Sequence, residues 1–243
     1  MTAGTAAKVP MDAMVLAAGL GRRMGPLTSN LPKPLVAVAG RTLLDRAFDL
    51  LAAEGVGRAI VNLHYLADCV ERHIAARPPK LDIAFSDERQ LLLETGGGIT
   101  RALPLLRSDP FLALNADNLW AGDRPAVARL AETWDDARMD ALLLLVPREK
   151  AHCHRGRGDF DLLPSGALRR RPKEGEAAHV YTGLQMLSKR LFEGVEVAPF
   201  SMNLLWDRAA AAGRLYGALY DGQWFDVGTA AAVPETERIL GRR

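Results

Sequence analysis

The chain has 243 residues, of which 49% are hydrophobic and 25% are charged, proportions that are ordinary for a globular protein. Its formal net charge of +2 is too small to indicate nucleic acid or an anionic membrane as the main partner. No apolar run approaches the roughly 20 residues needed to span a bilayer. Cys69 and Cys153 form neither a metal-binding spacing nor a disulfide framework. We therefore expect a cytoplasmic protein. We interpret residues 1–11 as a disordered lead-in, because they lack the apolar core of a signal peptide.

The first half of the chain alternates strand and helix patterns. Apolar runs predict strands at 13–18, 59–62, 81–85, 111–115 and 141–146. Amphipathic periodicity predicts helices at 42–54, 67–76, 99–106 and 125–134. We interpret the glycine-rich residues 94–98 as a tight turn that opens the third of these helices. This alternation is typical of an α/β fold, a doubly wound and mostly parallel sheet with helices on both faces.

The second half is less regular. A hairpin is predicted at residues 159–170 around the turn at 164–166. Further strands are predicted at 180–187, 215–220 and 223–227, and helices are predicted from Ser188, at 202–212 and after Thr229. No linker or repeat interrupts the chain. We therefore expect residues 1–243 to form a single domain, in which residues 147–180 form a small hairpin lid on the main sheet.

Three segments with functional potential follow predicted strands. These are the loop that begins at Gly19, the turn at 94–98 and the acid Asp117. Right-handed crossovers place the loops that follow parallel strands along one edge of the sheet. Ligands in such folds bind in the crevice outside the carboxyl ends of the strands. The sequence therefore predicts a binding site at this edge.

The most distinctive stretch is residues 13–38, in which a strand leads into two glycines, two arginines and a lysine held between prolines. A glycine turn exposes backbone N–H groups to a phosphate, and the basic side chains add positive charge around it. A dinucleotide fingerprint would need glycine in place of Met24 and an acid in place of Asn62. The Gly-Lys-Ser/Thr ending of a P-loop is also absent. The stretch predicts a triphosphate-binding loop of another kind.

The longer pattern reads Gly19-x-Gly21-x-Arg23-Met24-x-Pro26-Leu27-Thr28-x-x-x-Pro32-Lys33-Pro34. It resembles the signature of the sugar-1-phosphate nucleotidylyltransferases, the enzymes that make nucleotide sugars. The resemblance extends from Met11 to about Leu240. It implies a Rossmann-like nucleotidyltransferase fold, and an NTP and a sugar 1-phosphate as substrates. The expected reaction transfers a nucleoside monophosphate and releases pyrophosphate.

The resemblance also implies catalytic and metal-binding roles. Arg23 suits the leaving β- and γ-phosphates, and Lys33 suits the α-phosphate and the attacking phosphate. Both assignments fit a reaction in which positioning and positive charge supply most of the catalysis. Asp117 and Asp226 match the two metal-binding aspartates of the family. They are the expected ligands of Mg²⁺, which prefers oxygen ligands and keeps several waters.

The expected contacts with the two substrates follow from the same resemblance. The nucleotide-binding residues are Leu16, Ala17, Ala18, Gly19, Gly21, Asn62, Glu94, Thr95, Gly96 and Gly97. The sugar-binding residues are Asn115, Gly158, Asp159, Thr182 and Gly183. The glycines at 96–98 would let the backbone approach the base and ribose closely. His152 and His154 do not have zinc-binding spacing, and no role is predicted for them.

Residues 94–99, 156–160 and 224–229 favour one branch of the family, the uridylyltransferases of N-acetylmuramate α-1-phosphate that serve cell-wall recycling. This branch implies UTP and N-acetylmuramate 1-phosphate as substrates. Mannose-1-phosphate guanylyltransferases and other hexose-1-phosphate enzymes are the alternative. A non-catalytic regulatory protein that binds nucleotide sugars is a second alternative. We expect no nucleic acid or membrane partner, and a monomer or small homo-oligomer.

One segment departs from the family pattern. Many relatives have Glu-Lys-Pro before the strand that carries Thr182, whereas this chain has three arginines, Arg169, Arg170 and Arg171, followed by Pro172. One hypothesis is that an arginine here pairs with an anionic sugar substituent, such as the lactyl carboxylate of muramic acid. The alternative is that these arginines form a solvated hairpin edge.

Overall fold

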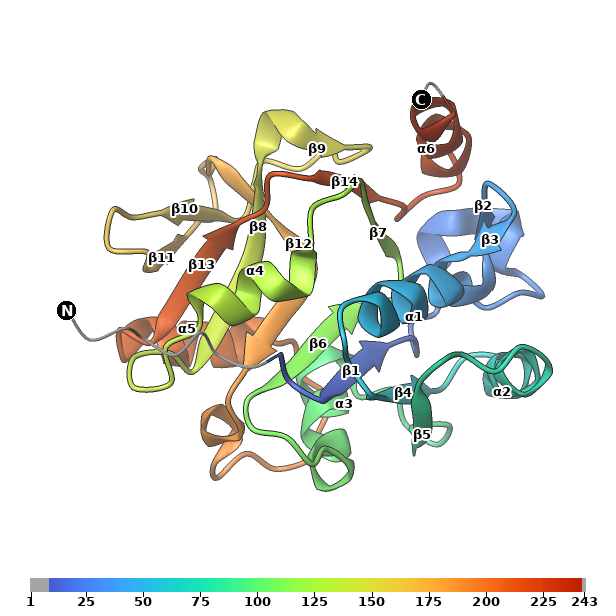
Figure 1. Cartoon of the computed structure of the whole chain (residues 1–243), viewed down its shortest axis with the longest axis horizontal. Helices are drawn as coiled ribbons and strands as arrows, with labels where there is room; N and C mark the ends of the chain where they lie inside the picture. The colour runs from blue at the N-terminus through green and yellow to red at the C-terminus, as the bar shows by residue number, and fades with distance from the viewer. Residues whose placement is uncertain (1–8, 242–243) are drawn as a thin grey trace.

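The computed structural model describes residues 9–241, so residues 1–8 of the predicted lead-in lie outside the described part of the chain. The main sheet has nine strands: β1 (Asp12–Leu16), β4 (Arg58–Leu63), β5 (Asp82–Asp87), β6 (Phe111–Asn115), β8 (Ala141–Pro147), β10 (Phe160–Leu162), β11 (Leu168–Arg170), β12 (His179–Leu187) and β13 (Leu215–Leu219). Their order is β11-β10-β12-β6-β1-β4-β5, and β8 joins β12 to β13 (Figure 1).

Most of the central ladders are parallel, which confirms the predicted α/β fold. β1 pairs in parallel with β4 and β6, β4 with β5, and β8 with β13. β12 runs antiparallel to both β6 and β8 and joins the two parallel groups. The carboxyl ends of β1, β4 and β6 therefore meet at one edge of the sheet.

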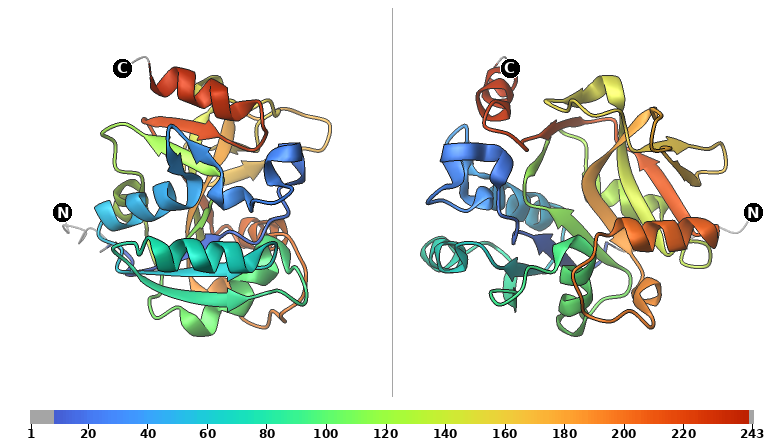
Figure 2. Two further views of the ribbon diagram at one scale, coloured as in Figure 1. Left: turned by 90° about the vertical axis from the view of Figure 1, so that its right-hand side faces the viewer. Right: turned by 180° about the vertical axis from the view of Figure 1, so that it is seen from behind.

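Helices cover both faces of the sheet. α1 (Leu43–Ala53), α2 (Ala67–Ala76) and α4 (Ala126–Thr133) contribute to one apolar core, and α3 (Glu94–Ala102) and α5 (Asn203–Ala211) contribute to the other. α1 and α4 lie in front of the sheet in Figure 1, and α5 lies in front when the molecule is seen from behind in Figure 2. β8 shows why the faces differ, because Leu142 and Leu144 enter the first core and Leu143 and Leu145 the second. Within residues 9–241, no helix combines the length and the apolarity needed to cross a membrane.

Two small sheets lie next to the carboxyl ends of the main strands. β7 (Asn118–Ala121), β14 (Gln223–Asp226) and β9 (Ala151–His152) form one, and β2 (Ala37–Val38) and β3 (Arg41–Thr42) form the other. The last helix is α6 (Ala232–Leu240), and 3₁₀ segments occur at Arg22–Thr28, Lys33–Leu35, Leu103–Leu105, Arg148–Lys150 and Lys189–Phe192. β7 and β9 were not predicted, because two to four residues are too few for a clear periodicity.

A third apolar cluster fastens the loop after β1 to the small sheet. Its buried members are Met24, Val36, Val38, Leu43, Leu119, Phe225, Val227 and Ala232. Met24 follows Arg23 directly and Phe225 precedes Asp226 directly. Burial of these two apolar neighbours therefore brings Arg23 and Asp226, which are far apart in sequence, into one region.

The hairpin prediction is confirmed, and its position is now defined. β10 pairs antiparallel with β11 and also contacts β12 through Phe160 and His179. A bridge between Ala167 and Tyr216 ties the turn of the hairpin to β13. The hairpin therefore extends the edge of the main sheet (Figure 1).

Two details of the predicted helices are wrong. Residues 94–98 are not a turn before a helix, because α3 itself begins at Glu94. The glycines are needed for packing, because a Cβ on Gly96 would collide with the ring of Phe200 and a Cβ on Gly97 with the carbonyl of Ala198. The helix predicted from Ser188 is only the short 3₁₀ segment Lys189–Phe192.

Glu54, just after α1, caps the start of α4. Its Oε1 accepts from the N–H of Ala126 at 2.9 Å, and its Oε2 accepts from that of Ala128 at 2.8 Å. Burial raises the pKa of the Glu54 carboxyl above its ordinary value of 4.5, although the hydrogen bonds from the α4 backbone oppose this rise. The stability linked to this group is therefore full below pH 4.5 and declines as the pH rises through the raised pKa.

We predict that Glu54→Gln removes this pH dependence. Urea denaturation at a series of pH values should show that the free energy of unfolding of the wild type minus that of the variant falls as the pH rises above 4.5. Glu196→Gln, which changes an exposed side chain, is the matched control and should give a flat difference. A Glu54→Gln difference that rises with pH would contradict the assignment.

Candidate functional site

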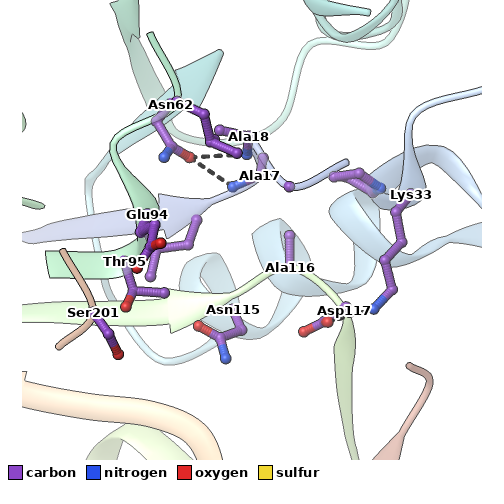
Figure 3. A pocket seen from close by; sticks show the side chains of 14 residues that line it. Ala17, Ala18, Lys33, Asn62, Glu94, Thr95, Asn115, Ala116, Asp117 and Ser201 are labelled. Carbon is purple, nitrogen blue, oxygen red and sulfur yellow. Dashed lines mark hydrogen bonds and ion pairs between the residues drawn. The ribbon is translucent and has the colours of Figure 1, made fainter. Parts of the chain in front are cut away.

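A cavity of about 350 Å³ opens at the carboxyl ends of β1, β4 and β6, the edge that the sequence predicted (Figure 3). Ten of the predicted site residues line it: Leu16, Ala17, Ala18, Gly19, Lys33, Asn62, Glu94, Thr95, Asn115 and Asp117. Leu92 and Ser201 also line it and were not predicted. They lie in irregular segments beside α3 and α5, where no motif marked them.

Asn62 organises the wall formed by the end of β1. Its Oδ1 accepts from the N–H groups of Ala17, at 2.7 Å, and Ala18, at 3.2 Å, as Figure 3 shows. Its Nδ2 donates to Oε1 of buried Glu88 at 2.8 Å, and Oε2 of Glu88 accepts from Leu93 N at 3.1 Å. Burial raises the pKa of Glu88. Asn62 and Glu88 therefore tie the first loop to the segment before α3 and fix the shape of the cavity.

The charged end of the cavity is formed by Lys33 and Asp117. Nζ of Lys33 lies 2.5 Å from Oδ2 of Asp117, and the lysine side chain is only 11% exposed. Lys33 opens a 3₁₀ segment between Pro32 and Pro34, so its backbone position is restricted. Asp117 follows β6, and its Oδ1 accepts from Asn118 Nδ2 at 3.3 Å. Figure 3 shows the ammonium group of Lys33 directed at this carboxylate.

Arg23 and Asp226 meet beside Gly228. A Cβ built on Gly228 would lie 2.6 Å from Asp226 Oδ1 and 3.1 Å from Arg23 Nη2, so glycine leaves room for both groups. β14 pairs with β7 so that Asp226 lies opposite Asn118, and Val227 N donates to the carbonyl of Asp117 at 3.2 Å. The two acids therefore lie at the ends of adjacent strands.

His154 is a site residue that the sequence did not reveal. Its Nδ1 lies 3.2 Å from Asp226 Oδ2. Burial alone would raise the pKa of Asp226, but the hydrogen bond from His154 and the nearby charges of His154, Arg23 and Lys33 outweigh burial and lower that pKa. Asp226 is therefore held in its ionised form. No sequence pattern marked His154, because this residue lies in an irregular loop whose position depends on the pairing of β9 with β14.

Gly183 supports Asp117 indirectly. Its φ is +86°, and a Cβ there would collide with Asn118 Nδ2, the group that donates to Asp117. Thr182, by contrast, is fully buried, and its Oγ1 donates to the carbonyl of Leu144 at 3.0 Å. The structure therefore places Gly183 beside the charged end and Thr182 within the sheet.

At four other predicted glycines, a side chain would point at neighbouring atoms of the protein itself. Gly96 and Gly97 pack under the segment 198–200, and Gly21, at φ +64°, packs against Thr28. Gly158, at φ +78°, faces the carbonyl of Ala177. The predicted contacts of these glycines with substrates stay predictions, because packing within the chain already accounts for the missing side chains.

A second and larger cavity lies on the predicted sugar side. It measures about 630 Å³ and is lined by Asp159, Tyr181 and Trp206 together with residues of the hairpin edge. Oδ2 of Asp159 accepts from the N–H of Tyr181 at 2.9 Å. A connecting cavity of about 220 Å³ shares Asn115 with the first cavity and Tyr181 with the second.

Comparison with known proteins shows the family of the chain. Residues 13–154 match the MobA-like NTP transferase domain. The chain is 42% identical to the N-acetylmuramate alpha-1-phosphate uridylyltransferase of Caulobacter vibrioides, over 96% of this chain and 98% of that protein. It is 26% identical to the mannose-1-phosphate guanylyltransferase catalytic subunit beta of Xenopus tropicalis, over 90% of this chain and 61% of that protein.

Solved structures share the fold. HddC from Yersinia pseudotuberculosis, solved in complex with GMP-PN, superposes with a TM-score of 0.77 and 22% identity, covering 95% of this chain and 99% of that one. At this identity the likeness concerns the fold alone.

We predict that Asn62→Ala lowers the free energy of unfolding by about 1–3 kcal/mol, because it leaves two backbone N–H groups and buried Glu88 without their partner. Urea denaturation of the variant and of Asn30→Ala, a matched change at an exposed loop position, would measure the loss. Equal stability of the two variants would show that Asn62 does not hold the cavity wall.

Proposed function

Because the chain belongs to the sugar-1-phosphate nucleotidyltransferase family, we propose that it transfers UMP from UTP to N-acetylmuramate 1-phosphate. The products are UDP-N-acetylmuramate and pyrophosphate. The identity of 42% to a uridylyltransferase of this specificity supports the choice over mannose-1-phosphate guanylyltransferase, at 26%. The role we propose is the recycling of cell-wall sugars.

The observation that carries the proposal is the meeting of two cations and two acids from three separate segments. Arg23 and Lys33 come from the loop after β1, Asp117 from the end of β6, and Asp226 from the end of β14. The pair between Lys33 and Asp117, at 2.5 Å, lies at the wall of the 350 Å³ cavity. A regulatory protein that only bound a nucleotide sugar would not need all four groups, so their presence favours an enzyme.

In the proposed reaction, an oxygen of the sugar phosphate attacks the α-phosphorus of UTP. The bond from this phosphorus to the β-phosphate oxygen breaks, and pyrophosphate leaves with the electron pair. Negative charge increases on the α-phosphate and on the leaving group. Lys33 would stabilise the α-phosphate and draw the attacking phosphate close, and Arg23 would stabilise the β- and γ-phosphates. No covalent intermediate with the protein is needed.

The acids fit a Mg²⁺ site. Both candidate ligands are carboxylates, their side chains are 28% and 24% exposed, and the lowered pKa of Asp226 keeps it ionised. Among residues 9–241, no group of three or more His, Cys, Asp or Glu side chains is placed to hold a metal. We propose that Asp117 and Asp226 hold Mg²⁺ together with substrate phosphates and waters. When bound, the ion would neutralise phosphate charge.

The pair between Lys33 and Asp117 suggests how substrate binding prepares the site. A triphosphate offers Lys33 a more negative partner than one carboxylate does. Transfer of Lys33 to a phosphate oxygen would release Asp117 as a ligand for Mg²⁺. The same exchange explains why a lysine, rather than an apolar residue, occupies this nearly buried position.

The proposal also includes the domain organisation, the partners, the location and the oligomeric state of the protein. Residues 1–243 would act as one nucleotidyltransferase unit, with residues 147–180 as the lid on the sugar side. The partners would be UTP and the sugar phosphate, without nucleic acid or membrane. The enzyme would act in the cytoplasm as a monomer or small homo-oligomer.

A panel assay tests the substrates. Pyrophosphate release with MgCl₂ would be measured for UTP, GTP, CTP and TTP, each with N-acetylmuramate, N-acetylglucosamine and mannose 1-phosphates. We expect the highest kcat/KM for UTP with N-acetylmuramate 1-phosphate. Preference for GTP with mannose 1-phosphate would support the alternative instead, and no release with any pair would refute the enzymatic assignment.

We predict that Lys33→Ala lowers kcat roughly 10²- to 10³-fold, because Lys33 would act on charge that develops in the transition state. Steady-state kinetics and a thermal unfolding curve would separate lost catalysis from lost folding. Lys80→Ala, at an exposed position between α2 and β5, is the matched control and should keep wild-type kinetics. Turnover of Lys33→Ala within about twofold of the wild type would remove Lys33 from the mechanism.

A further inference from the structure

The three cavities form one groove, which leaves the 350 Å³ cavity on the side of Thr95, Asn115 and Ser201. The connecting cavity shares Leu16, Thr95, Asn115 and Ser201 with the 350 Å³ cavity. It shares Tyr181, Asn203 and Trp206 with the 630 Å³ cavity. We call the 630 Å³ cavity the basic basin, after Arg170, Arg171 and Lys173 in its wall.

The charges of the basic basin are not all compensated. Nη1 of Arg170 lies 2.5 Å from Oδ2 of Asp207, so this arginine is already paired. The guanidinium of Arg171 instead donates to four backbone carbonyls, those of Gly158, Pro172, Lys173 and Gly175. These contacts hold the group in place without neutralising it.

Lys173 is the second uncompensated cation. Its side chain is exposed and makes no hydrogen bond or ion pair with any residue that the structure describes. Arg170, Arg171 and Lys173 face two acids in the basin wall, Asp159 and Asp207, so one net positive charge remains.

Tyr181 supplies an independent sign of a ligand. Its hydroxyl oxygen is buried and lacks a hydrogen-bond partner in the described part of the chain. The residue lines both the basic basin and the connecting cavity, and its ring packs edge-on against Trp206 with centroids 4.9 Å apart. Burial raises the pKa of Tyr181 well above its ordinary value, so the group remains a donor. A buried hydroxyl without a partner is costly, and an oxygen acceptor on a ligand would relieve that cost.

We propose that the basic basin binds the carboxylate of an acidic substituent on the sugar, with Lys173 and Arg171 supplying the charge and Tyr181 donating to a sugar-side oxygen. This inference rests on the proposed function, in which the sugar phosphate lies toward Lys33 and the sugar extends along the groove. The cations of the basin favour a carboxylate through charge-assisted hydrogen bonds. N-acetylmuramate carries a lactyl carboxylate that N-acetylglucosamine lacks, so the basin would select between them. Of the three arginines in the hypothesis drawn from the sequence, Arg171 is the one retained, because Arg169 pairs with Asp161 and Arg170 pairs with Asp207.

The test compares three sugar 1-phosphates: N-acetylmuramate, its lactyl carboxamide and N-acetylglucosamine. The carboxamide keeps the size of the substituent and removes its charge. Lys173→Gln should lower the kcat/KM ratio of N-acetylmuramate to carboxamide about 3- to 10-fold, and Lys173→Glu should lower it further. Lys80→Gln, an equal change of charge at a distant exposed position, should leave the ratio unchanged.

Asp207→Asn should change the kcat/KM ratio of N-acetylmuramate to carboxamide in the opposite direction. It removes the carboxylate that pairs with Arg170, so the preference for N-acetylmuramate over the carboxamide should rise about 3-fold or more. Ratios that stay unchanged in Lys173→Gln, Lys173→Glu and Asp207→Asn would overturn the proposal. A wild-type enzyme that does not distinguish the acid from the amide would overturn it too.

Binding measurements separate this proposal from the proposed reaction. Calorimetric dissociation constants for the three sugar phosphates would be measured with a non-hydrolysable UTP analogue and MgCl₂ present. Preference for the acid without pyrophosphate release in the assay would support the basin and refute the reaction. Pyrophosphate release with no preference in binding or kinetics would support the reaction and refute the basin.

Discussion

The ion pair between Lys33 and Asp117 is the interaction around which the site is built. It joins the loop after β1 to the end of β6, two strands that are neighbours in the sheet but about a hundred residues apart at this point in the chain. A charge pair this little exposed is weak evidence for stability, because desolvation offsets much of the Coulomb attraction. The pair is better explained by the proposed function, in which Lys33 moves to a phosphate and Asp117 binds Mg²⁺.

The rest of the scaffold restricts where these charges can lie. Asn62 and Glu88 hold the first loop from one side, and Gly183 leaves room for Asn118 beside Asp117 on the other. A separate apolar cluster carries Arg23 and Asp226 into place through their buried neighbours. Preorganisation of this kind is what a phosphate-transfer site requires, because little reorganisation remains when charge develops.

The alternation of strands and helices in the first half of the chain was predictable, because each element buries enough apolar residues to give a recognisable strand or helix pattern in the sequence. Arg23 and Lys33 were predictable from a motif with a physical role, and Asp117 and Asp226 from the resemblance to the family. His154, Ser201 and Glu88 were not, since they depend on contacts between segments that no local pattern encodes. Residues 94–98 were misread because glycine signals a turn locally, whereas here it admits the packing of Phe200 against a helix. The arginines of the hairpin edge could be evaluated only after Asp207 was located beside Arg170.

The exchange of Lys33 between Asp117 and the phosphates is the central claim, and a crystal structure with a non-hydrolysable UTP analogue and Mg²⁺ tests it most directly. The account predicts that Nζ of Lys33 leaves Asp117 Oδ2 and contacts a phosphate oxygen, while Asp117 and Asp226 bind the metal. A complex in which the 2.5 Å pair persists and the phosphates bind elsewhere would contradict it.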